Sequence, residues 1–262
     1  SQLIYGRRGT GKTHALKYLS SSIAAQGGHS IYLDLRSIGS NRSLYTETAR
    51  PPEERAIGLI LDVLGVITDE LYSLALAKID NAPHPEQIAI RLDDLTASIS
   101  EVSLDGETST EQRDSFDKKQ ENTDKAGAQL ALGKPEIEIG SSSFTKTAIT
   151  SEVRSTARGK AQKHINFGKV QSSLDGLLRI LGEPQVWLLI DEWSEVPIDL
   201  QPYLADLIRR TVLPIRCMVV KIAAIEHRTT VFLPRFGGEY IGLELGADIA
   251  ADVNLDDFLL FD

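Results

Sequence analysis

A group of glycines, cations and hydroxyls near the beginning of the chain has the composition of a phosphate-binding loop. Gly6, Gly11, Lys12 and Thr13 fit the pattern G-x-x-x-x-G-K-[ST] at every fixed position. Glycines let such a loop turn tightly, so that successive backbone N–H groups point at phosphate oxygens. Lys12 is then expected to reach the β- and γ-phosphates, and the Thr13 hydroxyl to be a ligand of Mg²⁺. The residues expected to contact the nucleotide are consecutive in the chain: Gly6, Arg7, Arg8, Gly9, Thr10, Gly11, Lys12, Thr13 and His14.

The segments on either side of this loop have the order that phosphate binding requires. Residues 2–5, QLIY, are short, apolar and prone to form a strand. After the loop, Leu16, Leu19 and Ile23 recur at helical spacing, and the pattern stops at Gly27. A helix that begins at the loop aims the positive end of its dipole at a bound anion. Residues 31–35 then form a second apolar strand, so that strand, helix and strand predict a parallel sheet.

A pair of carboxylates far along the chain is the expected partner of the loop. Residues 186–190, VWLLI, are a continuous apolar run of the kind found in buried parallel strands, and Asp191 and Glu192 follow directly. Ligands of open parallel sheets lie at the carboxyl ends of the strands. We therefore expect Asp191 to hold Mg²⁺ and Glu192 to act as the general base that polarises the attacking water.

The stretches GRRGTGKT and VWLLIDE together resemble the AAA+ and STAND groups of P-loop ATPases, and within them the branch of origin-recognition and replication-initiator ATPases. The resemblance implies a three-layer α/β/α core with a five-stranded parallel sheet in the order 5-1-4-3-2. It also implies ATP and Mg²⁺ as ligands, and ATP hydrolysis coupled to assembly on DNA or with partner proteins. ATP rather than GTP rests on this resemblance, and no N-K-x-D motif for guanine is present in the sequence.

Two further kinds of site residue follow from the resemblance. A polar sensor residue is expected after the strand CMVVKIAAI, and among Glu226, His227 and Arg228 we favour Arg228 as a catalytic residue. Members of the group also complete their active site with an arginine from a neighbouring subunit. The candidates for that role are Arg209, Arg210 and Arg235.

Two other functions remain open at this point. One is a signalling switch of the STAND type, for example in defence against phage, in which bound nucleotide acts as a latch and turnover is slow. The other is a P-loop scaffold that serves as a protein-binding module. The intact set of Lys12, Thr13, Asp191 and Glu192 argues against the scaffold, because a degenerate site is expected to lose at least one of these residues.

The distance in sequence between the two motifs predicts an insertion. We expect residues 1–43 and 170–262 to form the ATPase core, and residues 44–169 to form an inserted, mostly helical region beside it. The insertion should contain helices over 51–80 and 86–100, a polar excursion from 101 to about 128 and a hairpin that includes 137–139 and turns at 140–143. Within the core, residues 240–246 are expected to be the fifth strand, and a helical lid and a winged-helix domain have no room.

Composition limits the partners. The chain has 262 residues, a net charge of −9 and a pI of about 5.1, which argues against a dedicated nucleic-acid binder. A basic cluster over 154–164 could contact phosphates, but we favour a solvated helix face because no aromatic residues interleave with the charges. DNA contacts are otherwise expected from regions outside this sequence. The absence of a long apolar run predicts no membrane span, and the single Cys217 fits a cytoplasmic protein. We also expect self-association or a partner protein at the nucleotide site.

Overall fold

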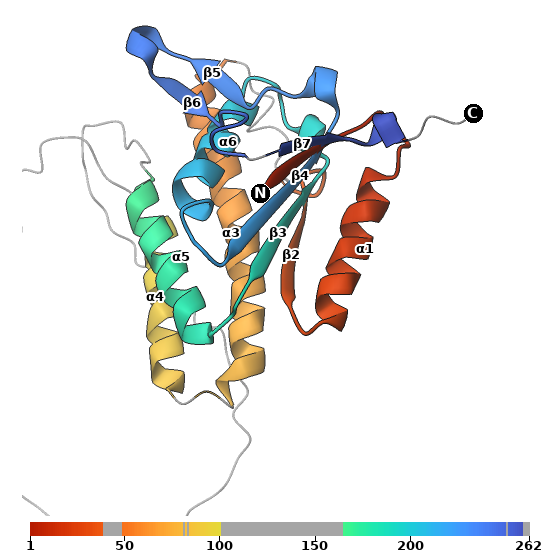
Figure 1. Cartoon of the computed structure of the whole chain (residues 1–262). Coiled ribbons are helices and arrows are strands. Elements are labelled where there is room, and N and C mark those ends of the chain that lie inside the picture. The colour runs from red at the N-terminus through yellow and green to blue at the C-terminus, as the bar shows by residue number, and fades with distance from the viewer. Residues whose placement is uncertain (39–48, 81, 83, 101–164, 250, 259–262) are drawn as a thin grey trace, which may run out of the picture. The chain divides into compact units, whose positions relative to one another are not determined.

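A computed structural model gives the fold of the chain (Figure 1). The elements described below belong to one compact unit, formed by Ser1–Ser103 and Lys163–Asp262. The structure describes residues 1–38, 49–80, 82, 84–100, 165–249 and 251–258.

A five-stranded parallel sheet is the centre of this unit. The strands lie in the order β2-β3-β4-β1-β7, and each hydrogen-bonded pair is parallel. The chain therefore has the α/β architecture expected from the alternation of apolar runs and helices. The strand bounds are Gln2–Tyr5 for β1, His29–Asp34 for β2, Val186–Asp191 for β3, Met218–Ala224 for β4 and Ala251–Asn254 for β7.

Helix α1, Lys12–Ala25, covers one face of the sheet (Figure 1). It begins directly after the glycine-rich loop, as the sequence predicts. Gln26 is its C-cap, and Gly27 follows with a φ of 74°, which is the left-handed conformation that glycine adopts at little cost.

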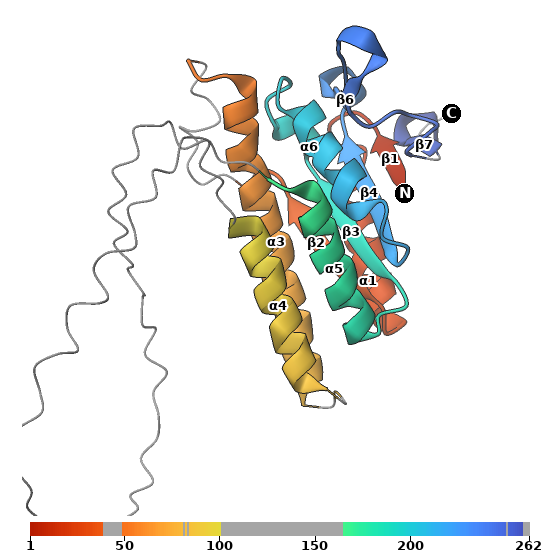
Figure 2. The same ribbon diagram turned by 90° about the vertical axis from the view of Figure 1, so that its left-hand side faces the viewer.

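The other face of the sheet carries a thicker layer of helices (Figures 1 and 2). Helices α3, Pro52–Ile79, and α4, Pro85–Ser100, form an antiparallel pair, and both confirm the helices expected there. Helix α5, Phe167–Leu181, packs against α4. Helix α6, Gln201–Leu207, continues into a π-helical turn over Ile208–Val212 and lies against α3. The three helices α3, α4 and α5 share one hydrophobic core with the sheet.

The two faces contain separate clusters of buried side chains. The large cluster joins the helices α3 to α6 to strand residues such as Leu3, Leu188 and Ile222, all of them fully buried. The small cluster lies under α1, where the buried residues are Leu16, Leu189 and Ala223. Because side chains alternate between the two faces of a strand, neighbouring residues of β3 belong to different clusters.

The fifth strand is not where the sequence placed it. Residues 240–246 were expected to complete the sheet, but β6, Tyr240–Gly242, pairs antiparallel with β5, Phe232–Pro234, as a separate hairpin. The fifth strand is β7, which pairs with β1. Glycine is required at Gly242, where φ is 115° and an added Cβ would lie 1.9 Å from the carbonyl oxygen of Val231. This close approach belongs to the hairpin, where Gly242 pairs with Phe232 and the N–H of Leu243 donates to the carbonyl oxygen of Val231.

Several expectations fall outside the described residues. They are the polar excursion after residue 101, the hairpin near 137–143 and the basic cluster over 154–164.

Candidate nucleotide-binding site

The glycine-rich loop has the backbone of an anion-binding turn. Gly9 and Gly11 have φ angles of 89° and 84°, and Gly11 is the N-cap of α1. Thr10 closes the turn, since its N–H and its hydroxyl both donate to the carbonyl oxygen of Arg7, at 3.3 and 2.9 Å. Within the described part of the chain, the N–H groups of Gly9, Gly11 and Lys12 donate to no acceptor. They are therefore available to a phosphate at the start of α1.

Gly6 is required by close packing at the start of the loop. A Cβ at this position would lie 2.5 Å from the Thr10 hydroxyl oxygen and 3.4 Å from Cβ of Leu255. The first glycine of the motif is thus explained by space, whereas Gly9 and Gly11 are explained by their φ angles.

The Lys12 side chain folds back over the loop. Its ammonium group donates to the carbonyl oxygens of Gly6 and Arg7, at 2.7 and 2.8 Å. Partial burial lowers the pKa of Lys12, and the negative charges of Glu192, Asp191 and, more weakly, Asp256 oppose this shift. The ammonium group is therefore held inside the loop and within the electrostatic range of both candidate carboxylates.

The remaining loop residues are open to solvent. Arg8 and His14 are exposed, and Thr13 is half-buried at the second position of α1. The Thr13 hydroxyl makes no hydrogen bond to any described residue, which leaves its oxygen free to bind a metal ion. These positions agree with the roles expected from the motif, and they do not test them.

Asp191 ends β3 as a buried, hydrogen-bonded carboxylate. Its side chain is almost fully buried, with 1% of the residue exposed. One carboxylate oxygen, Oδ2, accepts the hydroxyl of Tyr32 at 2.7 Å, and the other, Oδ1, accepts the N–H of Glu192 at 2.9 Å. Burial, followed by the hydrogen bond to Asp191, raises the pKa of Tyr32, so that the hydroxyl is a donor at neutral pH.

Glu192 is the residue with the most strained backbone of the site. Its φ of 57° is the single positive value of a non-glycine residue in the described part of the chain. Such a conformation costs a β-carbon residue about 1–2 kcal/mol. Strained backbone conformations are common at functional positions, where the surrounding structure holds them in place.

The Glu192 carboxylate is partly exposed and pairs with a cation that follows β2. The guanidinium of Arg36 lies 3.5 Å from Glu192 Oε1 and also binds Asp34 through two hydrogen bonds, at 3.0 and 2.6 Å. These hydrogen bonds lower the pKa of Asp34. Arg36 and Asp34 were not expected in the site from sequence, where they appear only as charged residues at the end of a strand.

A second unexpected residue contacts the loop from the last described segment. Asp256, in the short turn Leu255–Phe258, accepts the N–H of Arg7 with both carboxylate oxygens, at 3.2 and 3.0 Å. Its carboxylate also lies 3.4 Å from Nε of Arg7. The segment after β7 is therefore attached to the first turn of the loop, although the two are distant in the sequence.

The expected sensor residues lie in a turn after β4, over Glu226–Arg228. The Arg228 guanidinium donates to the carbonyl oxygen of Ser194 at 3.3 Å and lies 4.0 Å from a carboxylate oxygen of Glu195. Both partners belong to the turn that follows Glu192. Arg228 thus contacts the segment next to the candidate base, and Glu226 and His227 are exposed.

The three arginines considered as trans-acting groups all have partners within this chain. Arg209 and Arg210 both bind the buried carboxylate of Asp206, at 2.5 and 2.8 Å. Arg235, in the β5–β6 hairpin, lies 3.2 Å from Glu53 at the start of α3. An arginine that acts on a neighbouring subunit would first have to leave these pairs.

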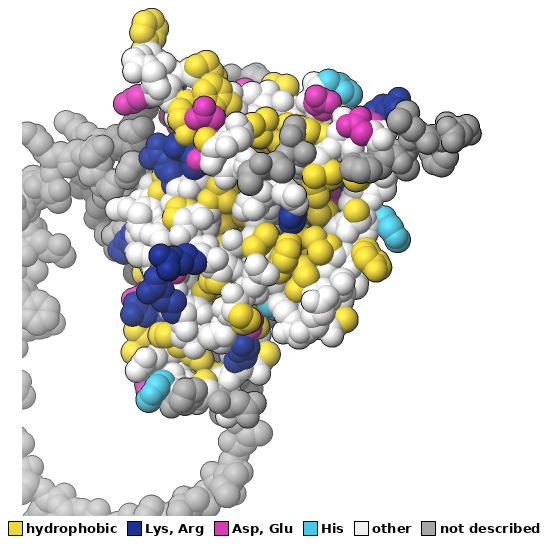
Figure 3. Space-filling model, in the orientation of Figure 1, with side chains coloured by type: hydrophobic (Ala, Val, Ile, Leu, Met, Phe, Trp, Pro, Cys, Tyr) yellow, Lys and Arg dark blue, Asp and Glu magenta, His cyan; other side chains and the backbone are white. Residues whose placement is uncertain are grey.

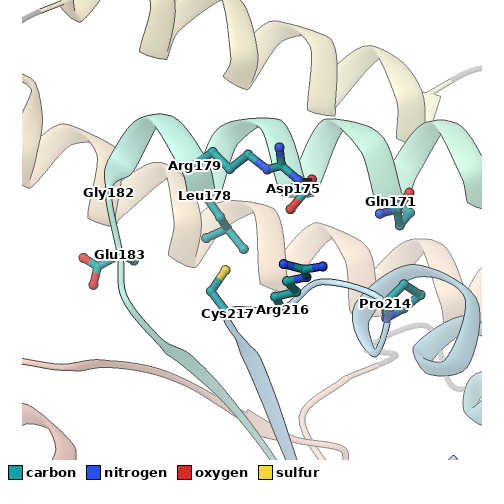
Figure 4. A pocket seen from close by; sticks show the side chains of 9 residues that line it. All are labelled: Gln171, Asp175, Leu178, Arg179, Gly182, Glu183, Pro214, Arg216 and Cys217. Atoms are coloured by element: carbon teal, nitrogen blue, oxygen red, sulfur yellow. Dashed lines mark ion pairs between the residues drawn. The ribbon is translucent and has the colours of Figure 1, made fainter.

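A hollow of about 570 Å³ lies at the amino ends of the strands, away from the glycine-rich loop (Figure 4). Three of its charged groups are paired, Arg179 with Asp175 at 2.7 Å and Glu183 with Lys78 at 2.6 Å, and Arg216 is a further cation of the lining. Cys217 lines the hollow as a half-buried free thiol, and burial raises its pKa, so that it is a poor nucleophile. Nothing here competes with the loop as a functional site.

The face of the molecule drawn in Figure 3 has dispersed charge. On the face drawn in Figure 3, the cationic side chains lie in small groups separated by hydrophobic and uncharged surface. Over the described ranges, no helix combines the length and the hydropathy that a membrane span needs. Within the same ranges, no three His, Cys, Asp or Glu side chains gather as a metal site. Mg²⁺ bound by phosphates needs only one or two protein ligands, so the donor set of Thr13 and Asp191 fits this ion.

No protein-family model, no curated protein and no solved structure matches this chain.

Proposed function

We propose that this chain is a Mg²⁺-dependent P-loop domain that binds and hydrolyses ATP, and that its nucleotide state controls assembly on DNA or with partner proteins. The observation that carries the proposal is the arrangement at the carboxyl edge of the sheet. A glycine-rich turn follows β1, Lys12 at the start of α1 folds into it, and the adjacent carboxylates of Asp191 and Glu192, at the end of β3, act electrostatically on the Lys12 ammonium.

The order of the strands also supports the proposal. Numbered along the chain within this sheet alone, the strands read 5-1-4-3-2 from the β7 edge, which is the order that the resemblance to AAA+ and STAND ATPases implies. One strand, β4, lies between the loop strand β1 and the carboxylate strand β3. The turn after β4, with Arg228, thereby flanks the space between the two motifs.

The residues of the chain divide the work as follows. The N–H groups of the loop and the Lys12 ammonium bind the phosphates and offset their charge. Thr13 and Asp191 would hold Mg²⁺, and the ion would supply positive charge that offsets the negative charge developing on the phosphates. Glu192 accepts the proton of the attacking water, since its carboxylate is partly exposed next to the buried Asp191.

A slow molecular switch is the second candidate, and one observation favours it. The ion pair with Arg36 restricts the side chain of Glu192, the candidate base. The Asp256 carboxylate accepts the N–H of Arg7 at the start of the loop. A site held in this way would bind nucleotide and turn it over slowly until a partner rearranges it.

The test compares the parent chain with Glu192→Gln, each with and without double-stranded DNA. We expect both proteins to bind ATP with Mg²⁺ and the variant to hydrolyse it about 10²–10⁴-fold more slowly, because the general base is lost. A parent chain that binds but hardly hydrolyses ATP would favour the switch. An increase of turnover on DNA would support an initiator-like role. If neither protein binds ATP with Mg²⁺, the proposal is wrong.

A further inference from the structure

We propose that Tyr32 is a positioning residue of the magnesium site, whose hydroxyl fixes the Asp191 carboxylate in the orientation that binds the metal. This inference rests on the proposed function and adds a residue to it. It starts from the contact between Tyr32 on β2 and Asp191 on β3, which spacing along the chain does not predict.

The pairing of the two strands explains how this contact forms. Tyr32 is opposite Leu189, and Asp34 is opposite Asp191. Tyr32 and Asp191 are therefore diagonal neighbours on the same face of the sheet, two residues apart in register. A tyrosine side chain is long enough to span this diagonal, and its hydroxyl donates to Oδ2 at 2.7 Å.

The Tyr32 ring is itself held by its neighbours. It packs in the small cluster with Leu16 and Leu189, between α1 and the sheet. The Lys17 ammonium lies 5.8 Å from the ring centroid, and Lys17 follows Thr13 by one helical turn. One aromatic ring thus joins the helix that carries the Thr13 ligand to the strand that carries the Asp191 ligand.

The chemical type of the donor matters. A carboxylate has about four lone-pair directions, and the Tyr32 hydroxyl and the Glu192 N–H each take one, on different oxygens. The remaining directions stay available to Mg²⁺. A neutral hydroxyl also leaves the full negative charge on Asp191, whereas a lysine or arginine in this place would neutralise it. Outer partners that orient a metal ligand typically contribute about 10–100-fold to metal affinity.

The experiment measures the Mg²⁺ concentration that gives half-maximal binding of a fluorescent ATP analogue. Tyr32→Phe keeps the packed ring and removes the hydroxyl, so we expect this concentration to rise by about 10–100-fold. Binding in excess EDTA should stay unchanged, because the loop and Lys12 are intact. The control is Tyr18→Phe, since Tyr18 is an exposed tyrosine of α1 and should titrate like the parent.

A double-mutant cycle shows whether Tyr32 acts through Asp191. In an Asp191→Asn background, Tyr32→Phe should cause no further change in the Mg²⁺ requirement. Equal Mg²⁺ requirements in a folded Tyr32→Phe and the parent would overturn the inference alone, as would additive effects in the cycle. A parent chain without Mg²⁺-dependent nucleotide binding would instead overturn the proposed function, and the inference with it.

If Tyr32→Phe does not fold, a measurement on the parent chain tests the same inference. With tyrosines carrying ¹³C at Cζ, addition of Mg²⁺ to the ATP complex should shift a resonance that persists in Tyr18→Phe. A spectrum in which no tyrosine resonance moves would contradict the role of Tyr32.

Discussion

The two faces of the sheet are built differently, and neighbouring residues of one strand show the contrast. Ile190 points to the helices α3 to α6 and is fully buried in the large cluster. Asp191 points to the face of α1, where it is as deeply buried but bonded to polar groups. On that second face Trp187 is only partly buried, and the Lys221 ammonium lies 5.5 Å from its ring centroid.

The two faces of the sheet contribute differently, one mainly to stability and the other to the candidate site. The large cluster contains almost all the fully buried aliphatic side chains of the described residues, so it provides most of the hydrophobic stabilisation. The face of α1 contains the glycine-rich loop, Tyr32 and Asp191, and it tolerates polar and partly exposed groups. A single strand, β3, thereby anchors its site in a rigid core through alternate residues.

The largest effect is expected from Lys12→Ala, which removes the cation of the loop. Nucleotide hydrolysis should fall by about 10²–10³-fold or more, because a preorganised donor to the phosphates is lost. The melting temperature without nucleotide should hardly change, since the Lys12 side chain is partly exposed and donates its hydrogen bonds to two loop carbonyls. Calorimetric ATP titration and circular dichroism measure the two quantities. If the variant binds ATP normally and hydrolyses it at the parent's rate, the loop is not part of the nucleotide-binding site.

Ile190→Ala tests the opposite side of the same strand. The variant should lose about 2–5 kcal/mol of unfolding free energy, because a cavity opens in the large cluster. Its folded fraction should bind ATP as the parent does, although Ile190 is adjacent to Asp191. Urea unfolding and ATP titration below the transition give both numbers. A strong loss of ATP affinity in the folded variant would show that the two faces are not independent.

Glu192→Gly addresses the strain at the site. Glycine adopts a φ of 57° without a Cβ penalty, so the variant should gain about 1 kcal/mol in unfolding free energy while hydrolysis is lost. Glu195→Gly is the matched control, since Glu195 lies in the following turn without a positive φ, and glycine should destabilise it by about 0.5–1 kcal/mol. Equal destabilisation of both variants would mean that Glu192 is not strained.

Sequence predicted the local elements of this site and missed its long-range contacts. The strand-loop-helix over residues 2–25 and the strand before Asp191 follow from apolar spacing and glycine positions, which are local signals. The fifth strand was predicted at the wrong place because Ala251–Asn254 has few large apolar residues, while the more apolar segment Tyr240–Gly242 forms a hairpin with β5. Strand pairing of this kind depends on which segments lie side by side.

The side-chain partners of the site depend on that pairing too. The contact of Tyr32 with Asp191 needs the register between β2 and β3, and the contact of Asp256 with Arg7 needs β7 beside β1. Neither register is readable from spacing along the chain.

The smallest effect is expected from Arg36→Ala. Arg36 follows β2 and pairs with both Asp34 and Glu192. Arg36 and Asp34 form an exposed pair, so the loss of unfolding free energy at pH 7 should be small, the smallest of these effects. Since Arg36 lowers the folded-state pKa of Asp34, its contribution is present above the unfolded pKa of Asp34, near 4 by the reference value for Asp. It is lost as the pH falls through the lower folded pKa. The difference between parent and variant should therefore shrink from pH 7 to pH 3 in urea unfolding. A difference that is constant or grows toward low pH would contradict the pairing of Arg36 with Asp34.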